Sequence, residues 1–303
     1  MRRKNLFVLL ALVLTMALLF AGCSGGGGTA GGKGKIVVGS KNFNENIILG
    51  EMLAQLIEAK TDLQVERKLN LGGTLVCFNA LKKGDLDLYP DYTGTGLMAI
   101  LKQPVETDPD KVYNYVQKEY NEKFKIKWMK PYGFNNTYAV AVRQETAEKH
   151  NLKKVSDLVP LAGNMVFGAE QEFFNRPDGY DGMIKAYGLK FKEHKSFETA
   201  LKYQATAQKK IDVTDAFSTD GELITYKLKI LDDDKKFFPP YFCTTVVRMD
   251  TLKKYPDLEK TLNLLAGKIS DDEMQQLNYQ VAEKKREAGE VVKEFLQKKG
   301  IIS

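Results

Sequence analysis

The chain has 303 residues and a formal net charge of +6, and it contains only two histidines and three cysteines. So few of these residues argue against a metal site and nearly exclude histidine-based catalysis. The positive charge is too mild and too scattered to indicate a nucleic-acid partner. The chain also lacks a nucleophile elbow and a phosphate-binding glycine pattern, so we expect no enzyme, no metal and no cofactor.

Residues 1–22 are predicted to be a signal peptide. Arg2, Arg3 and Lys4 form a positively charged start, and an almost unbroken apolar run follows from Leu6 to Phe20. The run is too short to span a membrane comfortably.

The sequence Ala21-Gly22-Cys23 resembles a bacterial lipobox, although Phe20 stands where a lipobox usually has leucine. In a lipobox the cysteine thiol takes a diacylglycerol and becomes the new N-terminus, and residues 23–34 would then form a glycine-rich tether. We therefore expect a protein anchored through lipid on Cys23 at the extracellular face of the cell membrane. The alternative is a plain secretory peptide in which Cys23 is incidental.

Strands and helices alternate after the tether. The pattern predicts a strand at 35–39, a helix opening at 42–45, a strand at 63–71, a helix from 72 and a third strand from 85. Further strands are expected at 126–129, 138–142, 165–168, 211–217 and 242–247, and further helical segments at 110–124, 156–161, 179–187, 197–209 and 274–295, with a capping box at 270–273. This alternation predicts an α/β fold whose first strands form a parallel sheet covered by helices on both faces.

Residues 85–96 combine a strand with a turn. A short alternating strand begins at Asp85, passes Pro90 and ends in a turn of threonines and glycines over 93–96, beside the ring of Tyr92. Open α/β sheets bind ligands at such strand ends. An ordinary polar turn is the alternative.

The mature chain is longer than one hydrophobic core usually holds. We predict two lobes, the first formed by residues 35–135 and 241–303 and the second by residues 136–240. The chain would cross between them twice, at 135–138 and at 238–241. Two lobes joined in this way can close on a ligand by hinge motion, and the cleft between them is a common place for a small-molecule site.

Six phrases occur along the chain in a fixed order. They are Gly39-Ser40-Lys41-Asn42-Phe43, Tyr89-Pro90-Asp91-Tyr92-Thr93-Gly94-Thr95, Asn136-Thr137-Tyr138, Phe174-Asn175-Arg176-Pro177-Asp178-Gly179, Asp215-Ala216-Phe217-Ser218-Thr219-Asp220-Gly221 and Phe238-Pro239-Pro240-Tyr241. Together with the lipobox they resemble the substrate-binding lipoproteins of osmoprotectant ABC importers, which bind glycine betaine, carnitine or choline. The resemblance covers essentially the whole mature chain. It implies a two-lobe, type II periplasmic-binding-protein-like fold, a monomer, and permease and ATPase subunits as partners.

The resemblance also implies a ligand site. A quaternary ammonium has no N–H donor, and aromatic faces attract it by ~2 kcal/mol or more per contact when it is desolvated. By resemblance, Tyr92, Tyr138, Phe217 and Tyr241 would form an aromatic cage, and Lys41, Thr95 and Arg176 would hold a carboxylate. Without the family, the same rings would be packing residues and both basic residues solvated surface charges.

Two details bear on the ligand. Phe217 stands where the family usually has tyrosine. A hydroxyl at Thr95 tolerates a carboxylate, whereas an aspartate would repel it, so glycine betaine and related betaines are favoured over choline alone. A choline-selective receptor or a receptor for polar or cationic amino acids is the alternative.

Cys77 and Cys243 are far apart in the sequence. They either form a disulfide outside the cell or are two buried thiols.

Overall fold

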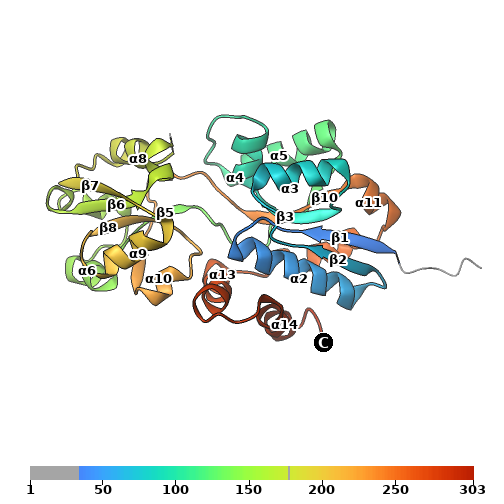
Figure 1. The fold of residues 1–303 in the computed structure, drawn as a ribbon. Helices are drawn as coiled ribbons and strands as arrows, with labels where there is room; N and C mark the ends of the chain where they lie inside the picture. The colour runs from blue at the N-terminus through green and yellow to red at the C-terminus, as the bar shows by residue number, and fades with distance from the viewer. Residues whose placement is uncertain (1–33, 177) are drawn as a thin grey trace, which may run out of the picture. The chain divides into compact units, whose positions relative to one another are not determined.

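The computed structural model describes residues 34–176 and 178–303, and Lys35–Ser303 form one compact unit (Figure 1). The predicted signal peptide, the predicted lipidation site Cys23 and nearly all of the predicted tether therefore lie outside the described residues. Within the described ranges, no helix has the length and apolar character needed to cross a membrane.

The first of two sheets has the strand order β2-β1-β3-β10-β4. Its strands are β1 (Lys35–Gly39), β2 (Gln64–Lys68), β3 (Leu88–Tyr92), β4 (Ile126–Trp128) and β10 (Cys243–Arg248). The strands β2, β1 and β3 are parallel, whereas β10 runs antiparallel to both β3 and β4. The expected parallel sheet is thus confirmed for the first three strands, and a late return of the chain makes the whole sheet mixed.

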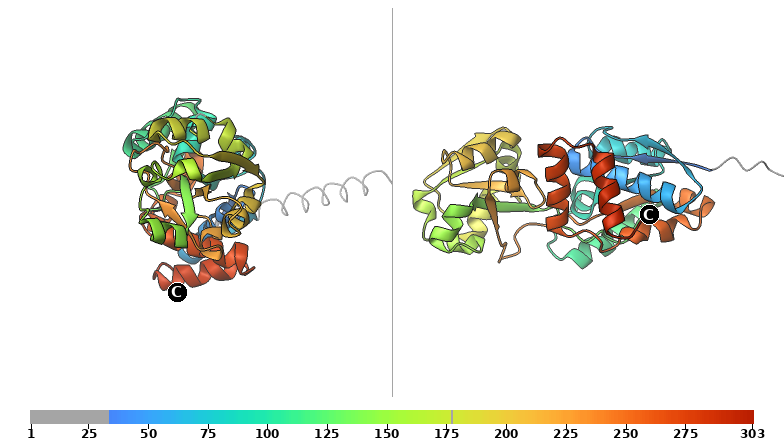
Figure 2. Two further views of the ribbon diagram at one scale, coloured as in Figure 1. Left: turned by 90° about the vertical axis from the view of Figure 1, so that its left-hand side faces the viewer. Right: turned by 90° about the horizontal axis from the view of Figure 1, so that it is seen from below.

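Helices from both ends of the chain cover this sheet, and we call the assembly the first lobe. They are α2 (Asn44–Lys60), α3 (Thr74–Lys83), α4 (Thr93–Thr95), η1 (Gly96–Ile100), α5 (Pro109–Phe124), α11 (Met249–Lys254), α12 (Leu258–Leu262), η4 (Asn263–Leu265), α13 (Asp271–Asn278), η5 (Tyr279–Glu283) and α14 (Ala288–Lys298). Figure 2 shows the red C-terminal helices beside the blue helix α2. The predicted capping box is present at the start of α13, where Ser270 accepts from the backbone of Glu273.

The second sheet has the strand order β7-β6-β8-β5-β9, and with its helices it forms the second lobe. Its strands are β5 (Tyr138–Arg143), β6 (Val166–Glu170), β7 (Glu193–Phe197), β8 (Val213–Phe217) and β9 (Leu228–Leu231). The helical segments are α6 (Gln144–His150), η2 (Val155–Leu158), η3 (Ala162–Asn164), α7 (Gln171–Asn175), α8 (Tyr180–Tyr187), α9 (Thr199–Ala207) and α10 (Glu222–Thr225).

Each lobe has its own hydrophobic core. In the first lobe, Ile48, Met52 and Leu56 recur at helical spacing on α2 and are fully buried against β1 and α14. In the second lobe, Phe167 of β6 and Met183 of α8 belong to a separate buried cluster. Separate cores allow the two lobes to move as units.

The chain passes between the sheets twice, and the two passages pair with each other. Asn135 forms an isolated antiparallel bridge with Phe242, and the backbone N–H of Asn136 donates to the carbonyl of Tyr241 at 3.2 Å. The lobe boundaries proposed near these residues stay a prediction.

The strand β7 was not predicted, and two local predictions were wrong. Residues Glu193–Phe197 carry no alternating apolar pattern, and all but the last are exposed. The helix expected from 197 starts instead at Thr199. The turn expected over 93–96 is helical and continues from α4 into the π-helical turn η1.

Candidate ligand-binding site

A cavity of about 560 Å³ receives side chains from both lobes and from the crossings. This volume lies within the range of small-molecule sites, ~300–1,000 Å³. The residues that line it are Lys41, Asn42, Phe43, Asn44, Glu45, Gly73, Thr74, Tyr92, Thr95, Asn136, Tyr138, Glu170, Tyr203, Phe217, Asp220, Gly221, Glu222, Tyr241, Asn278 and Ala282.

Six of the seven ligand residues predicted from the sequence are brought together here, namely Lys41, Tyr92, Thr95, Tyr138, Phe217 and Tyr241. The seventh, Arg176, is not one of the lining residues, but it touches two of them. Its guanidinium lies 5.3 Å from the ring centroid of Tyr138 and donates to the Tyr241 hydroxyl at 3.1 Å.

The predicted cage residues come from strand ends and a crossing. Tyr138 and Phe217 are direct partners in the antiparallel pair β5–β8, and their ring centroids are 4.6 Å apart. Tyr92 is the last residue of β3, and Tyr241 lies in the second crossing. Gly94 makes the approach of that crossing possible, because a β-carbon there would lie 2.7 Å from the carbonyl oxygen of Pro240. One aromatic group thus draws on both lobes.

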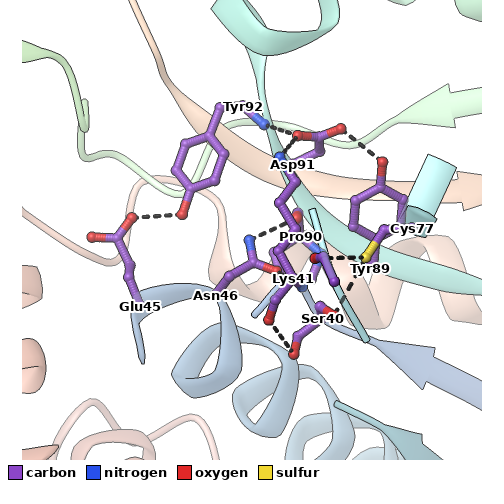
Figure 3. Close-up of polar contacts among 10 residues, drawn as sticks. Ser40, Lys41, Glu45, Asn46, Cys77, Tyr89, Pro90, Asp91 and Tyr92 are labelled. Carbon is purple, nitrogen blue, oxygen red and sulfur yellow. Dashed lines mark hydrogen bonds and ion pairs between the residues drawn. The ribbon is translucent and has the colours of Figure 1, made fainter. Parts of the chain in front are cut away.

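Lys41 is buried and ion-paired. Its ammonium lies 2.5 Å from Oδ1 of Asp91 and 5.2 Å from the ring centroid of Tyr92 (Figure 3). Asp91 also accepts from the backbone N–H of Tyr92 at 2.8 Å and from the Tyr89 hydroxyl at 2.7 Å. The pair therefore holds the end of β3 in place, and the positive charge of Lys41 is already balanced by the carboxylate of Asp91.

Arg176 is balanced in a similar way. Its Nε and Nη2 donate to the two carboxylate oxygens of Asp178 at 2.9 and 2.8 Å. This bidentate pair fixes the plane of the guanidinium where it meets Tyr138 and Tyr241.

The cavity also carries acidic residues that the sequence analysis did not propose as ligand residues. Glu45 and Glu170 are largely buried, and Tyr138 donates to Glu170 at 3.3 Å. Burial raises the pKa of Asp220 to about 7, although it accepts a hydrogen bond from Tyr203. Burial likewise raises the pKa of Glu222. Carboxylates around a cavity favour a cationic ligand.

Glu45 stands in the first turn of α2 and lies at the centre of a polar cluster. Its carboxylate accepts from Tyr92 at 2.6 Å, from Thr219 at 2.6 Å, from Asn136 at 2.9 Å and from Asn278 at 3.0 Å. Burial raises the pKa of Glu45, and these four hydrogen bonds act in the opposite direction. Because the four donors belong to both lobes and a crossing, Glu45 connects the predicted cage to the lobe interface.

Some of these residues carried a signal in the sequence and one did not. Asn136 and Asp220 belong to phrases quoted above, and Glu45 lies two residues after another. Their neighbourhoods were therefore identified without their roles. Asn278 lies in a C-terminal helix with no recognisable motif, more than 230 positions from Glu45 in the sequence. Only the fold brings it to the site.

The two cysteines among the described residues are not bonded to each other. Cys77 and Cys243 are both buried free thiols, which resolves the alternative in favour of no disulfide. Among the described residues, no group of three or more histidine, cysteine, aspartate or glutamate side chains could hold a metal ion.

Comparisons with known proteins agree with one another. The profile of the substrate-binding domain of ABC-type glycine betaine transport systems matches residues 34–298. The chain is 40% identical over 300 residues to the carnitine transport binding protein OpuCC of Listeria monocytogenes, covering 98% of this chain and 97% of that protein. It is 39% identical over 267 residues to the ergothioneine transport permease/ergothioneine binding protein EgtU of Helicobacter pylori, covering 88% of this chain and 48% of that protein.

A solved structure supports the same relationship. A crystal structure described as a glycine betaine/carnitine/choline ABC transporter superimposes with a TM-score of 0.83 at 37% identity, and the match covers 88% of this chain and all of that one. The two-lobed α/β fold predicted from the sequence is therefore confirmed.

Two sheets joined by paired crossings around a polar and aromatic cavity define a solute receptor of the periplasmic-binding-protein type. The chain belongs to the family of substrate-binding domains of ABC-type glycine betaine transport systems. It is the substrate-binding component of an importer of this class, in a family of binding proteins rather than enzymes.

Proposed function

We propose that this protein captures quaternary ammonium compounds that also carry a carboxylate, such as glycine betaine, carnitine and related betaines, and delivers them to a permease. The observation that carries the proposal is the convergence of Tyr92, Tyr138, Phe217 and Tyr241 on one cavity. Ring faces attract a trimethylammonium group without needing hydrogen bonds from it.

The surrounding charge supports a cationic group. Glu45, Glu170, Asp220 and Glu222 line the cavity, and the ammonium of Lys41 is paired with Asp91. We assign the trimethylammonium to the rings. We assign the carboxylate to the side of the site where Thr95, Lys41 and Arg176 lie, with Lys41 paired to Asp91 and Arg176 paired to Asp178. Both cations retain a role as donors while their aspartate partners keep them in place.

Isothermal titration calorimetry tests this proposal. Glycine betaine, carnitine, choline, ergothioneine and arginine are each titrated into the chain starting at Lys35. We expect saturable heat from the betaines and none from arginine. Ergothioneine is included because a relative at 39% identity is named for it. Binding of arginine alone would reject the proposal, and binding of choline alone would reject the carboxylate roles.

The rings are tested by substitution. Tyr241→Ala removes one aromatic face, and we expect the dissociation constant to rise by about ten-fold or more, because one desolvated cation–π contact is worth roughly 2 kcal/mol. Tyr115→Ala is the matched control, since Tyr115 is an exposed tyrosine on α5 and is not one of the residues lining the cavity. Equal losses in both variants would contradict the cage.

Membrane attachment is part of the same proposal. We infer that a diacylglycerol on Cys23 anchors the protein to the extracellular face of the cell membrane, where a monomer meets its permease. The lipobox-like sequence before the cysteine supports this. Cys23→Ala should move the protein from the membrane fraction to the medium or the soluble fraction, and an unchanged membrane fraction would contradict the anchor.

A further inference from the structure

Asn136 and Asn278 have amide orientations that the cluster around Glu45 fixes. The Nδ2 of Asn136 lies 2.9 Å from Oε1 of Glu45, and the Nδ2 of Asn278 lies 3.0 Å from Oε2. Each amide therefore presents its NH₂ group to the Glu45 carboxylate, and its carbonyl oxygen points away from that carboxylate. Asn278 is fixed a second time, because the same Nδ2 donates to the backbone carbonyl of Thr219 at 2.8 Å.

These orientations leave two carbonyl oxygens to be satisfied. The Oδ1 atoms of Asn136 and Asn278 are both buried, and neither has a hydrogen-bond partner within the described part of the chain. The whole Asn278 side chain is well buried, with 6% of the residue exposed. Both residues line the ligand cavity. A buried acceptor that stays unpaired carries its full desolvation cost, so such atoms in a binding site indicate a donor on the ligand.

We propose that Asn136 and Asn278, held by Glu45, form a subsite that accepts a hydrogen bond from a hydroxyl or N–H group of the ligand. The preferred ligand would therefore carry a donor in addition to its trimethylammonium and carboxylate groups. This inference rests on the proposed function, and it divides the betaines into two classes. Glycine betaine has no donor, carnitine has a hydroxyl, and ergothioneine has ring N–H groups.

The subsite explains why the cluster is built around an acid. Glutamine at position 45 could not accept from two amide NH₂ groups and two hydroxyls, and it would let the asparagine amides rotate. By accepting from both amides, the Glu45 carboxylate directs the two carbonyl oxygens away from itself.

Two ligand pairs test the subsite in the unaltered protein. Carnitine is compared with γ-butyrobetaine, which lacks only the hydroxyl, and ergothioneine with its analogue methylated on both ring nitrogens. Dissociation constants are measured by calorimetry. We expect the donor-bearing member of at least one pair to bind roughly ten-fold more tightly, a difference of about 1.4 kcal/mol. The pair that shows the difference identifies the donor as a hydroxyl or an N–H group.

Substitution then assigns the difference to a residue. Asn278→Leu keeps the approximate volume but removes the carbonyl oxygen, and we expect the ratio within the preferred pair to fall by about three-fold or more even if both members bind less tightly. Asn136→Leu is the second variant. Asn121→Leu is the control, because Asn121 is an exposed residue of α5. Thermal unfolding confirms that each variant is folded.

The outcomes separate the subsite from the proposed function. Equal affinities within both pairs would overturn the subsite while leaving the receptor for quaternary amines intact. A preference that Asn278→Leu and Asn136→Leu both leave unchanged would also overturn it. If the unaltered protein bound no quaternary amine at all, the proposed function and the subsite would both be rejected.

Discussion

The hydroxyl of Thr219 donates to Oε2 of Glu45 at 2.6 Å, and this bond joins the second lobe to the first. Two further bonds lie beside it: Gln275 of α13 donates to the carbonyl of Ser218 at 2.6 Å, and Asn278 donates to that of Thr219 at 2.8 Å. The segment after β8 is thus held against α2 and α13. Since Glu45 also accepts from Tyr92, lobe contact and the aromatic site depend on the same carboxylate.

Replacing Glu45 with glutamine should weaken both the contact between the lobes and ligand binding at the aromatic site. The amide has one acceptor oxygen, and its NH₂ group would face the NH₂ group of Asn136 or Asn278. We expect the dissociation constant of the best ligand to rise about ten-fold or more, consistent with ~1.5–3 kcal/mol for a hydrogen bond to a charged group. Calorimetry measures this effect.

Distances between the lobes provide an independent measurement for Glu45→Gln. Spin labels on Lys83→Cys and Lys190→Cys, in the chain starting at Lys35, report the separation by double electron–electron resonance. Both positions are exposed, and the native thiols of Cys77 and Cys243 are buried. We expect longer distances in the variant. Glu58→Gln, near the end of the same helix, is the control. The role of Glu45 would be refuted by distances and affinities that match the control.

Gly221 sets how closely the lobes approach. A β-carbon at this position would lie 2.8 Å from the backbone N and Cα of Tyr279, and backbone atoms cannot move aside easily. The φ of −66° at Gly221 suits alanine, so Gly221→Ala should leave each lobe folded. Overpacking costs about 1–3 kcal/mol, so we expect affinity to fall at least several-fold at nearly constant thermal stability.

The control for Gly221→Ala is Gly163→Ala. A β-carbon at Gly163 has its nearest neighbour at 4.0 Å, so affinity should not change. A Gly221→Ala protein that binds ligand as tightly as this control would show that the close contact is not required.

Lys41→Met should destabilise the fold. The substitution leaves Asp91 buried without its ion-pair partner, and breaking a buried pair in this way costs about 3–5 kcal/mol. Adding Asp91→Asn should restore part of the loss, because the unpaired charge disappears. Urea unfolding measures both effects. If Lys41→Met lost ligand binding but kept its stability, Lys41 would serve the ligand carboxylate alone.

Asp220 should make stability depend on pH. Burial raises its pKa in the folded protein to about 7 from an ordinary value of 3.8. Between these values the folded state holds a proton that the unfolded state has released, so stability falls as pH rises towards 7 and this contribution is constant above it. The full effect is on the order of 4 kcal/mol at about 1.4 kcal/mol per pKa unit.

Asp220→Asn tests that assignment. Urea unfolding at pH 5, 6, 7 and 8 should show a flatter profile and a more stable protein at pH 8 for the variant. The same slope in both proteins would place the pH dependence on another group.

Local sequence patterns predicted the elements whose own residues carry an apolar periodicity or a capping motif. The apolar spacing of Ile48, Met52 and Leu56 specified α2, and Ser270 with Glu273 specified the start of α13. The strand β7 could not be found in this way, because its pairing with β6 depends on backbone hydrogen bonds rather than on buried side chains.

The ligand site also combines residues that local sequence identified with residues that only long-range contacts bring together. The aromatic residues stood in quoted phrases and do line one cavity. The pairing of Lys41 with Asp91 and the bonds from Glu45 to Thr219 and Asn278 join residues that are 50 to 233 positions apart. No local pattern contains such distances, so the roles of these polar residues required the fold.

The central claim is that the cavity recognises a quaternary ammonium by its charge on aromatic faces. The most direct measurement compares the dissociation constants of carnitine and of its analogue in which carbon replaces the ammonium nitrogen, so that an uncharged tert-butyl group takes the place of the trimethylammonium. The shapes are nearly the same, and only the cation attracts the ring faces. We predict that carnitine binds at least about 100-fold more tightly, since several rings contribute ~0.5–2 kcal/mol each. Equal binding of the two compounds would contradict the account, because the cavity would then select shape and apolar surface rather than positive charge.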